Sequence, residues 1–237
     1  MSEWRETIQA GDRICLRSGY SKADRILLWF TGEDEKDARK TVDRLVTEQC
    51  GTDWQIVACP VSDWDRSLSP WKADPAFGRI LFAGEGAETL SWIRRDLMPR
   101  LAQDRDSENP VSFYIGGYSL AGLFSLWAFL ESGLFAGAAS VSGSLWYPGW
   151  REYAASRAVP EGSSIYMSLG IREEKTRNVK MKSVGEETRR QAEAFAHNPA
   201  VAHFQMEWNE GGHFNSPDLR IAKGFSWLLQ QKTDTAV

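Results

Sequence analysis

The stretch YIGGYSLAGLFSLW, residues 114–127, places a serine among three glycines at the start of a strongly apolar run. A serine that precedes a helix usually acts as an N-cap, accepting a hydrogen bond from a backbone N–H of the first turn. A capping box would place Glu or Gln three residues after Ser119, but that position is Gly122. Glycine weakens a helix, so the sequence here serves something other than helix stability. Two hypotheses therefore compete for Ser119: a helix cap and a nucleophile.

The small residues around the serine favour the nucleophile. The G-x-S-x-G pattern of a nucleophile elbow appears here as Gly117-Tyr118-Ser119-Leu120-Ala121, with alanine at the last position. Small side chains let a strand turn sharply into a helix, so that the serine projects at the top of the sheet. The next backbone N–H, that of Leu120, then points toward an oxyanion that forms on a substrate.

Apolar runs of strand length alternate with runs of helical period on both sides of this motif. We expect strands at 25–31, 54–60, 111–116, 135–141, 164–169 and 201–208, and helices at 36–49, 87–101, 120–132, 186–196 and 217–230. Nearly continuous apolar strands separated by helices indicate a mostly parallel sheet covered on both faces. The sequence thus predicts an α/β fold, a three-layer sandwich with a mostly parallel central sheet flanked by helices, as one domain over 1–237. Ligands of such sheets bind beyond the carboxyl ends of the strands, in the strand-to-helix loops.

Composition and charge argue against several other classes. The net charge is −4 and no cluster of unopposed positive charge occurs, so no nucleic-acid partner is expected. No stretch approaches the ~20 apolar residues that span a bilayer, and the first residues lack the apolar core of a signal peptide. The three cysteines, Cys15, Cys50 and Cys59, are odd in number and far apart, which favours a reducing compartment over a disulfide framework or a zinc site. We expect a cytoplasmic protein without metal, cofactor or membrane partner.

A serine nucleophile needs a general base, and the chain offers three histidines. His197 lies at the end of an expected helix and His203 inside an expected strand, where structural roles are the usual interpretation. His213 follows the last strand, after two glycines, at the sheet edge from which a loop can reach a serine elbow. The pattern therefore indicates His213 as the base.

The histidine in turn needs a carboxylate that orients it and stabilises its cation, in the chain order serine, acid, histidine. Between Ser119 and His213, the stretch SLGIREEKTRN (168–178) offers Glu173 and Glu174. Either acid could instead be solvated at a helix start and paired with a neighbouring base. We favour Glu173, with Glu174 as the alternative.

Two further sets of residues complete the candidate site. A second oxyanion donor is expected in the loop after strand 25–31, as the backbone N–H of Gly32 or Glu33. The chain also contains 11 tryptophans, several of them in expected loops, which suggests a ligand pocket with aromatic walls. Such aromatics would equally suit the core or a homodimer interface. The candidates for substrate contact are Trp71, Trp146, Tyr147 and Trp150.

The chain resembles the esterase D-like members of the α/β-hydrolase superfamily, which include S-formylglutathione hydrolases, trilactone siderophore esterases and feruloyl or acetyl-xylan esterases. The resemblance rests on the elbow at 117–122, SVSGSLWYPGW at 140–150, SLGIREEKTRN at 168–178 and GGHF at 211–214, and spans residues 25 to 229. It departs at Thr31, where a histidine is common before the oxyanion glycine, and at Ala121. The resemblance implies a serine carboxylesterase that hydrolyses a small-molecule ester through Ser119, His213 and Glu173 and an acyl-enzyme intermediate.

Three alternatives are weighed against this hypothesis. An acyltransferase, a thioesterase or a peptidase would use the same acyl-enzyme, and the sequence does not separate them. The threonine at position 31 leaves room for a non-catalytic binding module on a hydrolase scaffold. A nucleotide site at Gly116, Gly117 and Gly122 is disfavoured, because the spacing differs from G-x-G-x-x-G and no Gly-Lys-Ser/Thr element is present.

Overall fold

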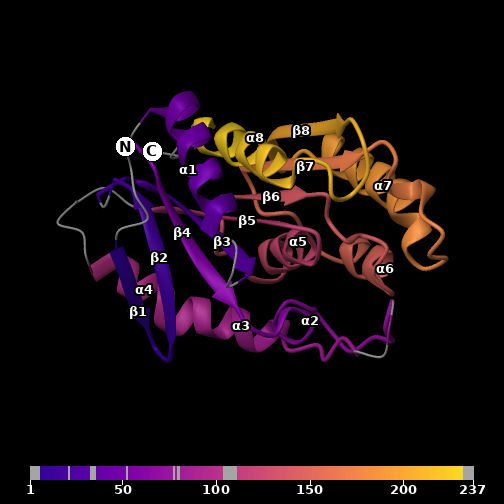
Figure 1. The fold of residues 1–237 in the computed structure, drawn as a ribbon, viewed down its shortest axis with the longest axis horizontal. Helices are drawn as coiled ribbons and strands as arrows, with labels where there is room; N and C mark the ends of the chain where they lie inside the picture. The colour runs from indigo at the N-terminus through magenta and orange to yellow at the C-terminus, as the bar shows by residue number, and fades with distance from the viewer. Residues whose placement is uncertain are drawn as a thin grey trace.

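An eight-stranded sheet forms the centre of the fold (Figure 1). The computed structural model describes residues 6–20, 22–32, 36–51, 53–76, 78, 81–103 and 111–231. Its strands are β1 (Glu6–Ala10), β2 (Arg13–Gly19), β3 (Arg25–Gly32), β4 (Gln55–Val61), β5 (Ser112–Tyr118), β6 (Gly137–Val141), β7 (Ser163–Gly170) and β8 (Val201–Asn209). They lie in the order β1-β2-β4-β3-β5-β6-β7-β8. The strands from β3 to β8 are parallel, and β1 and β2 pair antiparallel, so the mostly parallel sheet is confirmed.

Helices cover both faces of this sheet. They are α1 (Lys36–Cys50), α2 (Trp64–Ser67), α3 (Gly86–Trp92), α4 (Met98–Gln103), α5 (Leu120–Ser132), α6 (Trp150–Ala155), α7 (Val184–Ala196) and α8 (Pro217–Gln230). A π-helical turn, η1 (Ile93–Leu97), joins α3 to α4, and two 3₁₀ turns, η2 (Glu173–Lys175) and η3 (Met181–Ser183), lie before α7. Figure 1 shows α1 and α8 side by side; they cover one face, and α3, α4, α5 and α7 cover the other. None of the helices described is both long and apolar enough to cross a membrane.

Alternate residues of the central strands face two separate cores, because successive side chains of a strand point to opposite faces. On β3, Trp29 packs edge-on against Phe225 of α8, with ring centroids 5.5 Å apart. The next residue, Phe30, packs against Phe124 of α5 at 5.0 Å. Burial on both faces explains why these strands read as nearly unbroken apolar runs.

Several elements of the fold go beyond the sequence expectations, among them the short helices α2 and α6. The antiparallel β1–β2 pair was not predicted; β1 buries only Ile8 and Ala10, too few apolar residues for a clear strand pattern. The expected helix 87–101 is divided by η1, where the Met98 N–H donates to the carbonyl of Ile93, five residues back. Pro99 follows immediately and has no N–H with which to continue an α-helical ladder.

Candidate active site

Ser119 occupies a sharp turn between β5 and α5. Its backbone has φ 60° and ψ −122°, a left-handed conformation that a non-glycine residue adopts at a cost of about 1–3 kcal/mol. The backbone N–H of Ser119 donates to the carbonyl of Val141 at 3.0 Å, which ties the turn to the end of β6. The hydroxyl makes no capping hydrogen bond to α5. Ser119 thus stands at the N-cap position of the helix while its hydroxyl is free to point elsewhere.

Close contact between the strand end and the first helical turn explains the small residues of the motif. A Cβ atom placed on Gly117 would lie 2.5 Å from the Cβ of Ala121 and 2.8 Å from its backbone carbonyl. Real Cβ atoms essentially never approach so closely, so position 117 accepts only glycine. The alanine at position 121 fits in this turn beside that glycine.

The structure brings Ser119, His213 and Glu173 together. His213 lies in the turn after β8, and its Nε2 is 3.1 Å from the Ser119 Oγ. Its Nδ1 is 2.6 Å from Oε2 of Glu173, which lies in η2 after β7. With the proton on Nδ1 donated to Glu173, Nε2 is left as the acceptor for the serine hydroxyl proton.

The neighbouring acid and another histidine lie elsewhere. Glu174 forms a bidentate ion pair with Arg189 of α7, at 2.7 and 3.0 Å. His197 ends α7, and its Nδ1 is 2.9 Å from the carbonyl of Glu193. Of the two acids that the sequence offered, Glu173 is therefore the one beside the candidate base.

Glu173 is buried and held on both carboxylate oxygens. Oε1 accepts hydrogen bonds from the Gly170 N–H at 2.7 Å, the Ser142 hydroxyl at 2.9 Å and the Arg220 guanidinium at 3.1 Å. Burial raises the pKa of Glu173, but the hydrogen bond and charge of His213, with the bonds from Gly170 and Ser142, outweigh it and hold the pKa below the ordinary 4.5. The carboxylate is thus ionised at neutral pH.

Backbone groups suited to an oxyanion lie beside the serine. The Leu120 N–H belongs to the first residue of α5, where a helix offers no internal acceptor. Gly32 ends β3, which pairs with β5 so that Phe30 lies opposite Gly117. Gly32 and Ser119 each follow that pair by two residues, so both come just after the last paired residues of these neighbouring strands. The other candidate donor, Glu33, lies outside the described residues.

The four aromatic candidates divide into two groups. Tyr147 and Trp150 are 2% and 1% exposed and pack in the core, so neither side chain lines a pocket open to a ligand. This corrects the expectation that both contact substrate; the burial of these rings leaves no surface for it. Trp71 and Trp146 are only partly buried. The Tyr147 hydroxyl donates to the carbonyl of Trp71 at 2.6 Å and so holds the loop that carries Trp71. Burial raises the pKa of Tyr147 to about 12.

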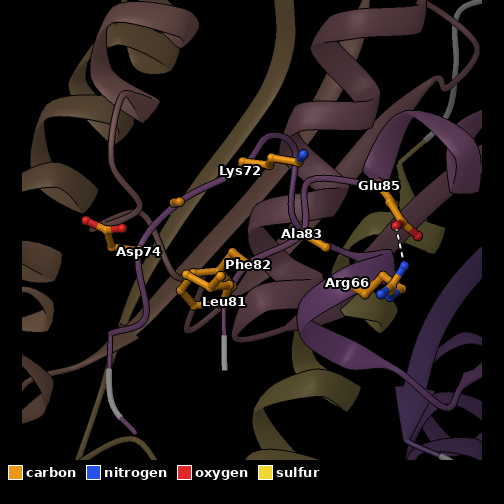
Figure 2. A pocket seen from close by; sticks show the side chains of 8 residues that line it. Arg66, Lys72, Asp74, Leu81, Phe82, Ala83 and Glu85 are labelled. Carbon is orange, nitrogen blue, oxygen red and sulfur yellow. Dashed lines mark hydrogen bonds and ion pairs between the residues drawn. The ribbon is translucent and has the colours of Figure 1, made fainter. Parts of the chain in front are cut away.

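A pocket of about 540 Å³ opens on the loop between β4 and α3 (Figure 2). Figure 2 shows Arg66 and Glu85 facing one another in an ion pair at one side, with Leu81 and Phe82 nearby. The ring of Phe82 lies 6.1 Å from that of Trp146, so the pocket adjoins the partly exposed aromatics. Within the part of the chain that the structure describes, no three His, Cys, Asp or Glu side chains group in a way that could hold a metal ion.

Three residues of the site were missed by sequence reasoning. Ser142 and Arg220 bind Oε1 of Glu173, and the Ser144 hydroxyl is 3.4 Å from the Ser119 Oγ. Both serines lie in the stretch SVSGSLWYPGW, which signalled a loop but no role for its hydroxyls. Arg220 lies on the buried face of α8, four residues before Gly224. A charged residue on a buried helix face is the feature of the sequence that could have identified it.

Comparison with known proteins agrees with the fold and identifies the family. The family profile described as "Putative esterase" matches residues 19–216. No curated protein sequence matches the chain. Similar solved structures include an IroE-like serine hydrolase from Shewanella oneidensis (TM-score 0.74, 14% identity, 92% of this chain and 76% of that one) and the siderophore hydrolase EstA from Aspergillus nidulans (0.72, 14%, 94% and 93%). The S-formylglutathione hydrolase FrmB from Staphylococcus aureus is also similar (0.55, 10%, 95% and 99%).

The chain has an α/β-hydrolase fold, with a mostly parallel sheet between two layers of helices, and the similar structures share that fold. Because the family profile covers most of the chain, the chain belongs to this esterase family. It is a carboxylic ester hydrolase.

Proposed function

We propose that the chain is a serine carboxylesterase in which Ser119 is the nucleophile, His213 the general base and acid, and Glu173 the residue that orients His213. The observation that carries the proposal is the continuous line of contacts from the Ser119 Oγ through both ring nitrogens of His213 to Oε2 of Glu173, at 3.1 and 2.6 Å. A non-catalytic module would not need the serine and histidine within hydrogen-bond distance. The same geometry thus supports the catalytic hypothesis over the binding hypothesis.

The reaction proceeds in two stages. His213 Nε2 removes the hydroxyl proton as the Ser119 Oγ attacks the ester carbonyl carbon, and the carbonyl oxygen becomes an oxyanion. The Leu120 N–H and an N–H of the Gly32–Glu33 segment donate to that oxyanion; one such donor contributes about 10²–10³ in turnover. His213 then gives its proton to the leaving alcohol, and the acyl group stays on Ser119. Water, deprotonated by His213, attacks the acyl-enzyme and releases the acid.

Trp71 and Trp146 are proposed as the aromatic walls for a small-molecule ester. They are the partly exposed members of the aromatic group, and Trp146 lies two residues after Ser144, whose hydroxyl is near the nucleophile. The similar structures include a siderophore hydrolase and an S-formylglutathione hydrolase. A substrate panel therefore includes a trilactone siderophore and S-formylglutathione beside simple alkyl and aromatic esters.

The test measures hydrolysis of p-nitrophenyl acetate and butyrate by the wild type, by Ser119→Ala and by Ser125→Ala. Ser125 is a matched control, since it is a buried serine of the same helix whose hydroxyl bonds the carbonyl of Ala121. Loss of the nucleophile should lower turnover by about 10⁶, whereas the control should hydrolyse both esters normally. Activity retained in folded Ser119→Ala would overturn the proposal.

We also propose a reducing, cytoplasmic location. Cys15 and Cys59 lie on the neighbouring strands β2 and β4 with their sulfur atoms 3.6 Å apart, as free and buried thiols. Burial raises the pKa of the Cys59 thiol well above its ordinary value, which keeps it protonated. Two unpaired thiols this close together are typical of proteins from a reducing compartment, and fractionation of cells that express the protein tests the location.

A further inference from the structure

Arg220 is a buried arginine that the catalytic proposal does not use. Its side chain is 3% exposed, on the face of α8 that packs on the sheet. Burial of a guanidinium is costly unless its donors are satisfied, so each of its contacts has structural weight.

The guanidinium contacts both loops that carry the candidate acid and base. Nη1 donates to Oε1 of Glu173 at 3.1 Å and to the Ser142 hydroxyl at 3.2 Å. Nη2 donates to the carbonyls of Glu210 and Gly212 at 2.8 and 3.1 Å. Gly212 immediately precedes His213, so one planar group joins the carboxylate to the backbone that holds the imidazole.

We propose that Arg220 is a positioning residue that sets the distance and angle between Glu173 and His213; this inference rests on the proposed function. Arg220, Ser142 and the Gly170 N–H together occupy Oε1. Only Oε2 then faces His213, and the carboxylate has no freedom to rotate away from Nδ1. The bonds to Glu210 and Gly212 keep the histidine loop at a fixed distance from that carboxylate.

An arginine suits this role and a lysine does not. The guanidinium presents its donors in a rigid planar fork, whereas a lysine ammonium is a single point of charge on a flexible chain. The two terminal nitrogens here serve four acceptors on three different segments of chain. A lysine at position 220 would retain the charge, but its single nitrogen could not bond both the Glu173 carboxylate and the carbonyls of Glu210 and Gly212.

The decisive variants are Arg220→Met, Arg220→Lys and Arg220→Ala, with Arg17→Met as a control. Arg17 is also a buried arginine, 6% exposed and paired with Glu6, but it lies on β2 near the far edge of the sheet. Active sites are counted by titration with a fluorophosphonate, so that kcat is expressed per competent serine. A role confined to stability would lower the melting temperature in both Arg220→Met and Arg17→Met and leave kcat unchanged.

The positioning role predicts a different result. Arg220→Met and Arg220→Lys should lower kcat by about 10- to 100-fold, the effect of losing one hydrogen bond to a charged group, with KM changed by less than about twofold. Millimolar guanidinium should restore part of the kcat of Arg220→Ala, but none of that of Glu173→Ala. A kcat within about twofold of wild type in folded Arg220→Met, or the absence of rescue, would overturn the proposal.

A second readout is independent of ester hydrolysis. The Nδ1 proton between His213 and Glu173 should give a low-field proton resonance in the wild type, and this resonance should shift or vanish in Arg220→Lys and stay unchanged in Arg17→Met. An unchanged resonance in Arg220→Lys contradicts the role of Arg220. A wild type that has the resonance yet hydrolyses no ester contradicts the proposed function instead, so the two failures are distinguishable.

Discussion

Glu173 and His213 meet at 2.6 Å although 40 residues separate them in the chain. Glu173 follows β7 and His213 follows β8, and these strands are parallel neighbours. Because the carboxyl ends of parallel strands lie at one edge of the sheet, the loops that follow them converge there. The same edge carries Ser119 after β5, so the topology of the sheet assembles all three side chains.

The choice between the two adjacent acids leads to a direct prediction. Glu173→Gln should lower kcat by about 10⁴, because an amide cannot stabilise the imidazolium and favours the wrong tautomer of His213. Glu174→Gln removes only an ion pair with Arg189 near the surface and should leave kcat within about twofold of wild type. Steady-state kinetics of both variants on p-nitrophenyl butyrate provide the measurement. Equal effects of the two substitutions would show that the acid has been misassigned.

The strained backbone of Ser119 predicts a conflict between stability and activity. Glycine tolerates a φ of 60° without strain, so Ser119→Gly should stabilise the fold by about 1 kcal/mol while it abolishes hydrolysis. Ser119→Ala also lacks the hydroxyl but keeps the Cβ, and it should gain no such stability. Urea unfolding of the three proteins compares them; a glycine variant less stable than the alanine variant argues against strain at this turn.

The division of the aromatic residues predicts two kinds of defect. Trp150→Ala removes a fully buried ring and should cost about 3–5 kcal/mol of unfolding free energy. Trp146→Ala removes a partly exposed ring. It should raise KM for aromatic esters and lower the free energy of unfolding by less than Trp150→Ala does. Unfolding curves and Michaelis–Menten kinetics of each variant distinguish the roles. A Trp146→Ala variant with the wild-type KM for every ester tested would remove that residue from the substrate pocket.

The lowered pKa of Glu173 predicts how stability depends on pH. In the unfolded chain this carboxyl titrates near its ordinary pKa of 4.5, and in the folded protein it titrates lower. Its contribution is therefore complete above pH 4.5, and it is lost as the pH falls through the folded pKa, because the unfolded state takes up the proton first. As the pH falls below 4.5, the unfolding free energy of the wild type should fall more steeply than that of Glu173→Gln. Parallel slopes would mean that the folded pKa is not lowered.

The sequence predicts the parallel part of the fold well, and physical reasons explain what it leaves out. Strands such as β3 are buried on both faces, so almost every residue is apolar and the pattern is clear. The β1 strand (Glu6–Ala10) lies at the sheet edge and buries only alternate residues over five positions, which gives a weak signal. The division of the helix at η1 depends on which backbone carbonyl each N–H reaches, and no apolar pattern encodes that.

The candidate site is predictable where its residues have local signatures. The small residues of the motif around Ser119 are explained by the close contact between Gly117 and Ala121. Among the three histidines, His213 is distinguished by its position in the loop after the last strand. Glu173 and Glu174 are adjacent, and only the direction of each side chain separates them. Arg220 reaches the site from α8, and its partners lie on three other segments. No local pattern specifies such a contact.

The central claim is that Ser119 is the activated nucleophile, and labelling with a fluorophosphonate tests it most directly. The folded protein is treated with the reagent, digested and examined by mass spectrometry while ester hydrolysis is followed in parallel. The account predicts one adduct per chain, on the peptide that contains Ser119, with hydrolysis lost in proportion to labelling and no adduct in Ser119→Ala. An unlabelled folded protein, or an adduct on another residue that accompanies the loss of activity, would contradict it.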